Sequence, residues 1–149
     1  MRKKRQLNRL GDIWFGAEGE EDGKPLICRG RKYIPSGAVE PSYPTRVSIY
    51  WSYVPENESG MPDAATEESQ YEMEDALEGL DSGEYSYLML VVTGNGRKEW
   101  HWYVSDVGVW GERLNEMLAE HTVLPIRIEK SPEPDWALFR DFISGLDGI

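Results

Sequence analysis

Two β-rich runs on either side of Asn95 and Gly96 constrain this chain most strongly. The runs YSYLMLVVT (85–93) and KEWHWYV (98–104) are rich in β-branched and aromatic residues. Asn-Gly is the pair that two-residue hairpin turns prefer, because both residues accept a positive φ. A phosphate-binding GxG loop would instead need a helix after it, and a strand pattern follows here. The sequence therefore predicts an antiparallel strand pair.

Further strand and helix patterns surround this pair. Residues 12–34 predict a hairpin with an Asp22-Gly23 turn, and 46–54 alternates apolar and polar residues as a half-buried strand does. Asp63 can cap a helix that runs to about residue 80. The pattern then predicts a helix over 107–121, a strand over 123–129 and a helix over 135–146. The first of these helices presents Trp110, Leu114, Met117, Leu118 and His121. The order βαββαβ predicts an α+β fold: a ferredoxin-like sandwich with an N-terminal β-hairpin and an added C-terminal helix.

The length of 149 residues fits one domain. We expect a basic flexible arm over 1–10 and a single α+β domain over 11–149, with its core in 46–130. Cys28 is the only cysteine, which excludes an intramolecular disulfide and suits a reducing compartment. No apolar run has the length of a signal sequence or a membrane span. We therefore expect a cytoplasmic protein without membrane contact.

Charge is unevenly distributed along the chain. The net charge is −11, yet five of the 16 basic residues lie in the first ten positions. Between Arg46 and Arg97 there is no lysine or arginine, and every charged residue is acidic. A field of one sign repels phosphate backbones and attracts basic partners, so we expect no nucleic-acid ligand. The alternative is that this acidic segment only keeps the protein soluble.

The acidic segment motivates a first functional hypothesis. We expect a non-catalytic binding module that docks on a basic protein, as an inhibitor, immunity protein or regulator of a nuclease or toxin would. The expected contacts are Glu58, Asp63, Glu67, Glu68, Glu72, Asp75 and Glu78. The segment NESGMPD (57–63) has a second interpretation, as a turn that starts the helix. Neither a cofactor nor a metal ion is expected, and the acids lack the loop spacing of a calcium site.

A second hypothesis concerns His101, which lies between two tryptophans. Alternation places its side chain on the opposite face of the strand from theirs. The residues expected on that face are Tyr50, His101, Tyr103 and Arg127. Such a cluster could bind a small ligand or perform acid–base chemistry. No nucleophile or metal-ligand spacing accompanies it, so cross-strand packing is the favoured interpretation and an enzyme the less favoured one.

The run 85–93 bears apolar side chains on both faces. Alternation assigns Tyr85, Tyr87, Met89 and Val91 to one face and Leu88, Leu90 and Val92 to the other. Both faces then need covering, for which the N-terminal hairpin and the C-terminal helix are available. Covered faces, together with the missing basic-Gly-aromatic-Gly pattern, argue against an RNA-binding sheet.

Four segments together resemble a known bacterial family. They are NESGMPD, MEDAL (73–77), LVVTGNGRKEWHWYV (90–104) and PDW (134–136). Over about residues 46–142 the chain resembles the bacterial domain of unknown function numbered 695. The resemblance implies no established enzymatic activity. It also implies an architecture similar to that of the protein regulator of ribonuclease E, a ferredoxin-like inhibitor. The basic arm and the first hairpin lie outside the strongest similarity.

Overall fold

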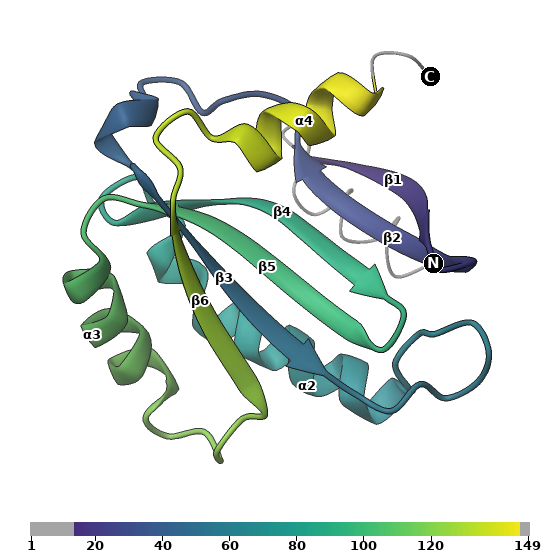
Figure 1. Cartoon of the computed structure of the whole chain (residues 1–149). Coiled ribbons are helices and arrows are strands. Elements are labelled where there is room, and N and C mark those ends of the chain that lie inside the picture. The colour runs from purple at the N-terminus through teal and green to yellow at the C-terminus, as the bar shows by residue number, and fades with distance from the viewer. Residues whose placement is uncertain (1–13, 147–149) are drawn as a thin grey trace.

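The computed structural model describes residues 14–146, which form one six-stranded antiparallel sheet and three α-helices (Figure 1). The strands are β1 (Trp14–Glu21), β2 (Lys24–Arg31), β3 (Thr45–Ser52), β4 (Ser86–Gly94), β5 (Arg97–Val104) and β6 (Ile126–Pro132). The helices are α2 (Ala64–Ala76), α3 (Val107–Leu118) and α4 (Ala137–Leu146), with short 3-10 turns η2 (Glu40–Ser42) and η3 (Glu78–Leu80). The α+β class is confirmed, whereas the expected arm over 1–10 lies outside the described residues.

The sheet has the strand order β1-β2-β4-β5-β3-β6, and every neighbouring pair is antiparallel. Two of its connections are the predicted two-residue turns. Asp22 and Gly23 have φ of 52° and 76°, and Asn95 and Gly96 have φ of 51° and 80°. Positive φ at both central residues matches the twist of the flanking strands. Both hairpin predictions are confirmed.

The first hairpin extends the sheet, because β2 pairs with the edge of β4. The expectation that this hairpin would cover one face of the sheet is wrong. β2 pairs with β4 in a register that places Cys28 opposite Val92. The reason is physical: without β2, the outer edge of β4 would expose unpaired backbone N–H and C=O groups. Trp14 of β1 nevertheless joins the core, with 4% of its surface exposed.

The main core lies between the sheet and the two helices α2 and α3. Its sheet side comes from alternate residues of β3 and β5, among them Ile49, Trp100 and Trp102. The helices contribute apolar side chains three and four residues apart, the spacing of an amphipathic helix. Met73 comes from α2, Leu77 from its C-cap, Leu80 from η3, and Trp110 and Leu114 from α3. The prediction that His121 belongs to this apolar stripe is wrong, because α3 ends at Leu118 and the side chain of His121 is exposed.

A second, smaller core lies on the other face of the sheet, beneath α4. Met89 and Tyr103 from the sheet pack there against Trp136 and Phe139. Figure 1 shows α4 lying apart from α2 and α3. The C-terminal helix therefore covers the second face, as predicted, and the sheet is buried on both sides at this point.

Alternation along β4 breaks at Met89. Leu88 and Leu90 pair with adjacent residues of β5, so β4 contains one extra residue there, a β-bulge. Beyond the bulge each side chain points to the face opposite the one that strict alternation assigns. Val91 consequently pairs with Trp100 and lies in the main core with Leu88. Its predicted position on the face of Met89 is wrong, because a periodic pattern does not reveal a bulge.

Candidate functional site

Helix α2 presents an acidic face away from the core. Gln70 and Met73 point inward and are buried, whereas Glu68, Glu72 and Asp75 are exposed. These three acids follow the spacing i, i+4, i+7, which places them on one side of a helix. Glu78 in η3 is also exposed. The structure therefore brings four of the seven predicted contact residues onto one contiguous stretch of α2 and η3, named here the acidic face.

The acidic face is not neutralised within residues 14–146. None of its four carboxylates forms an ion pair there, while every arginine of that range pairs with a carboxylate elsewhere. Those arginines are Arg29, Arg31, Arg46, Arg97, Arg113, Arg127 and Arg140. Like charges at i, i+4 destabilise a helix by roughly 0.2–0.5 kcal/mol per pair. The acidic face therefore costs stability that no described contact offsets.

The other three predicted contact residues have different surroundings. Asp63 is the N-cap of α2 and accepts the backbone N–H of Thr66 at 2.8 Å, a hydrogen bond that lowers the pKa of its carboxyl. Glu67 is half-buried and already has a partner. Glu58 is exposed in the loop after β3, where its carbonyl oxygen accepts Lys24 Nζ at 2.9 Å. Of these, Glu58 is the one that remains open to a partner through its carboxylate.

The segment 57–63 packs on the β4–β5 turn. The carbonyl oxygen of Gly60 accepts the Gly96 N–H at 3.0 Å and the Tyr53 hydroxyl at 2.7 Å. Gly60 has a φ of 79°, and a Cβ there would lie 2.9 Å from the backbone nitrogen of Asn95. Only glycine meets both conditions. These contacts support the structural interpretation of NESGMPD.

Beneath the acidic face lies a buried ion pair that sequence patterns did not reveal. Arg29 Nη2 donates to Glu74 Oε1 at 2.7 Å, and Trp100 Nε1 donates to the same oxygen at 2.8 Å. Burial raises the pKa of Glu74, but the charges of Arg29 and Lys98 and the two hydrogen bonds hold it below its usual value. The pair joins β2, α2 and β5, so it ties the hairpin to the helix. Its members are far apart in sequence, which explains why periodicity missed it.

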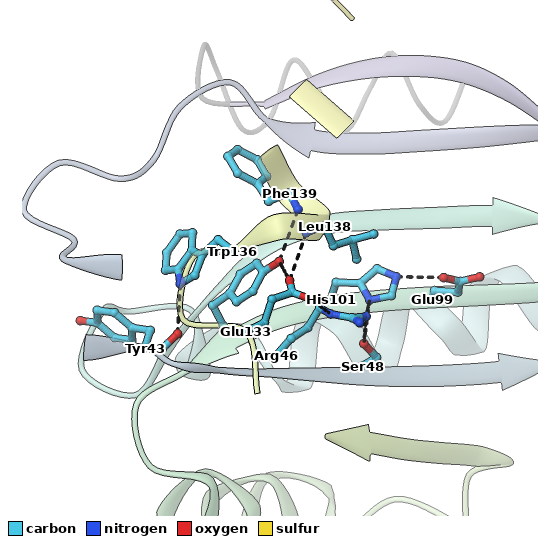
Figure 2. A network of polar contacts seen from close by, with 10 residues as sticks. Tyr43, Arg46, Ser48, Glu99, His101, Glu133, Trp136, Leu138 and Phe139 are labelled. Atoms are coloured by element: carbon cyan, nitrogen blue, oxygen red, sulfur yellow. Dashed lines mark hydrogen bonds and ion pairs between the residues drawn. The ribbon is translucent and has the colours of Figure 1, made fainter. Parts of the chain in front are cut away.

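His101 lies at the centre of a second polar network, on the opposite face of the sheet from the tryptophans, as predicted. Figure 2 shows its ring between Ser48 and Glu99: Nδ1 lies 2.7 Å from Ser48 Oγ, and Nε2 lies 2.8 Å from Glu99 Oε1. Burial raises the pKa of Glu99, but the contacts with His101 and Arg97 bring it below its usual value. Ser48 and His101 are only 2% and 3% exposed.

The four residues of the predicted ligand face separate into two groups. The ring of Tyr50 meets that of His101 edge-on at 6.2 Å, and the guanidinium of Arg127 lies 4.9 Å from the Tyr50 ring centre. Tyr103 belongs instead to the cluster under α4. Its ring stacks on Trp136 with centroids 4.5 Å apart, and its hydroxyl donates to Glu133. Burial and that carboxylate raise the pKa of Tyr103.

Ser48→Ala is expected to lower the free energy of unfolding by about 1–3 kcal/mol, because His101 Nδ1 would lose a buried partner. Urea denaturation of both proteins measures the difference. Ser52→Ala is the matched control, since Ser52 lies on the same strand with an exposed side chain and should change stability by less than about 0.5 kcal/mol. Equal effects of the two substitutions would show that the contact with His101 contributes nothing.

A family match covers nearly all of the described residues. Residues 13–144 match the model of a family described as "Family of unknown function (DUF695)", so the chain belongs to that family. The resemblance seen in the sequence is confirmed. The match begins before β1, so the N-terminal hairpin, which had been placed outside the strongest similarity, is part of the family domain. No curated protein matches the chain.

Two kinds of site are absent from the described residues 14–146. None of the helices within residues 14–146 combines the length and apolarity needed to cross a membrane. In the same range, no three His, Cys, Asp or Glu side chains are grouped in a way that could hold a metal ion.

Proposed function

We propose that this protein is a non-catalytic binding module whose acidic face docks on a basic protein, as an inhibitor, immunity protein or regulator. The observation that carries the proposal is the set of four exposed carboxylates without an ion pair in residues 14–146, on a helix that would be more stable without them. A basic nuclease or toxin is the class of partner that fits. We place the interaction in the cytoplasm, because Cys28 is the chain's only cysteine and disulfides are rare in that compartment.

The strand order supports a more specific architecture. From β3 onwards the chain runs β3-α2-β4-β5-α3-β6, and its four strands lie in the order β4-β5-β3-β6. We assign this part to the ferredoxin-like sandwich, with the hairpin β1–β2 and α4 as additions. Such an architecture would resemble that of the protein regulator of ribonuclease E. It presents one helix of the pair, α2, as an accessible outer surface.

Charge complementarity would act mainly on the rate of association. Opposite potentials steer two proteins together before they touch, and dissolved salt screens the attraction within about 10 Å at moderate ionic strength. The outward side chains of α2 suit this role, because they are exposed and carry one sign of charge. The same field would repel nucleic acids.

Affinity capture with charge-reversed variants tests the proposal. Wild-type protein, Glu68→Lys/Glu72→Lys/Asp75→Lys and a control with the same charge change are each incubated with lysate of the source cell at low and high salt. The control is Glu112→Lys/Glu120→Lys/Asp141→Lys, whose positions are exposed outside α2. Mass spectrometry should find a basic protein bound by the wild type and the control at low salt only. Retention of that protein by the α2 variant, or capture of none by the wild type, would contradict the proposal.

A second candidate function is supported by the contacts of His101. Ser48, His101 and Glu99 place a hydroxyl, an imidazole and a carboxylate in the order used by hydrolases with a serine nucleophile. The ring nitrogens are exchanged, because Ser48 contacts Nδ1 and Glu99 contacts Nε2. Burial of Ser48 and His101 weighs against it, since a substrate would have to reach them. A fluorophosphonate probe that labels Ser48 in the native protein would favour this function. Labelling confined to unfolded protein, or its absence, would exclude it.

A further inference from the structure

A cavity of about 540 Å³ lies between the first hairpin and the end of α2. Its wall is formed by Trp14 and Arg29 of the hairpin, by acids of α2 and the segment after it, and by Leu88 and Trp102 of the sheet. This volume is within the range of small-molecule pockets, roughly 300–1,000 Å³. The indole and leucine side chains provide apolar surface beside charged groups. The cavity therefore has the size and mixed lining of a ligand site.

Two of the lining residues carry buried N–H groups without a partner. Arg29 is 7% exposed and Trp102 is 2% exposed, yet Arg29 Nε and Trp102 Nε1 have no hydrogen-bond acceptor among residues 14–146. A buried donor without an acceptor destabilises the folded state, so an acceptor that reaches it is favoured. Arg29 already donates through Nη2 to Glu74, so the unmet donor is specifically Nε. A carboxylate inside the cavity has two oxygen atoms, one acceptor for each of these N–H groups.

Charge is divided between the inside of the cavity and its rim. Inside, Glu74 is paired with Arg29 and Asp81 with Arg31, so the N–H groups of Arg29 and Trp102 are the polar groups left to attract an anionic oxygen. At the rim, Asp75 and Glu78 are exposed and have no ion pair among the described residues. The inside thus favours an anionic oxygen and the rim favours a cation.

We propose that this cavity binds a small zwitterion of the amino-acid class. Its carboxylate accepts the N–H groups of Arg29 and Trp102, and its ammonium group lies between Asp75 and Glu78. The apolar part of the molecule packs against Trp14 and Leu88. This site goes beyond the proposed docking of a basic protein. It shares Asp75 and Glu78 with the acidic face, whereas Glu68 and Glu72 lie outside the cavity lining.

Isothermal titration calorimetry with matched probes tests the proposal. γ-Aminobutyrate and ε-aminocaproate carry both charges, caproate carries only the carboxylate and n-hexylamine only the ammonium. At least one zwitterion should bind about tenfold more tightly than either singly charged probe, because both ends of the cavity are then used. In nitrogen-labelled protein, the indole N–H signals of Trp14 and Trp102 should shift on binding, whereas that of Trp51, which lines a different cavity, should not.

Variants of exposed residues keep the fold intact. Asp75→Asn/Glu78→Gln should weaken binding of the zwitterion about tenfold or more, because its ammonium group loses both carboxylates. Glu68→Gln/Glu72→Gln is the matched control on the same helix, outside the cavity lining, and should leave the affinity unchanged. The proposal is overturned if neither zwitterion binds better than the singly charged probes, or if the two double variants behave alike. In that event the cavity holds only water.

Discussion

Glu74→Gln is expected to lower the free energy of unfolding by about 3–5 kcal/mol, the usual effect of removing one partner from a buried ion pair. The glutamine has nearly the same shape and can still accept the Trp100 N–H. It cannot neutralise Arg29, which is 7% exposed, or Lys98, which is 4% exposed. Arg29 would then lose its paired carboxylate, and Lys98 would lose the attraction of the same charge. The hairpin and α2 would lose the contact that ties them together.

The loss should also appear in the pH dependence of stability. The folded-state pKa of Glu74 lies below its unfolded value, so its contribution is present above about pH 4.3, the ordinary pKa of glutamate, and is lost as pH falls through the folded pKa. Urea denaturation at neutral and acidic pH measures both effects. The two proteins should approach each other in stability at acidic pH. A neutral-pH difference below about 1 kcal/mol would contradict the account, as would an equal loss for the exposed control Asp75→Asn.

Trp136→Ala is expected to cost about 3–5 kcal/mol, the range for truncating a buried aromatic side chain. The indole is fully buried, stacks on Tyr103 at 8° between ring planes and donates to the carbonyl oxygen of Tyr43 at 3.0 Å. Trp136 has a φ of 56°. Alanine has a similar unfavourable backbone energy at this φ. The difference in the free energy of unfolding therefore measures the contribution of the indole ring and its hydrogen bond.

The consequence for α4 is specific. Phe139 and Leu138 donate their backbone N–H groups to Tyr103 and Glu133, and the Trp136 ring positions this first turn of the helix. Amide hydrogen exchange should therefore accelerate in α4 more than in α3. Trp136→Phe, which keeps part of the stacking area, should lie between alanine and wild type. Unchanged exchange in α4 with alanine at 136 would show that the ring does not hold the helix on the sheet.

Local patterns predicted most of the elements. Asn95-Gly96 and Asp22-Gly23 determine their turns through backbone preferences of the two residues themselves. Asp63 caps α2 because a short acceptor side chain can reach the N–H three residues on. The alternation in β5 likewise placed His101 opposite the tryptophans. Each of these depends on neighbours in the sequence, which a pattern can represent.

Features that depend on distant residues could not be predicted. The hairpin joins the sheet only because the edge of β4 is available, and the bulge at Met89 shifts side chains without changing composition. Glu74 resembles its exposed neighbours in sequence, yet Arg29, 45 positions away, makes it a buried partner. The acidic face was recognisable from charge. The sequence could not show that the acidic face lacks ion pairs within residues 14–146, because this depends on where every arginine lies in the fold.

The kinetics of binding to the captured basic partner test the central claim most directly. Association rate constants are measured by surface plasmon resonance over a range of salt concentrations for the wild type, the reversed α2 variant and the reversed control. We expect the α2 variant to associate at least about tenfold more slowly at low salt, and the difference to shrink as salt screens the charges. The control should follow the wild type. Equal association rates for the α2 variant and the wild type at low salt would contradict a docking role for the acidic face.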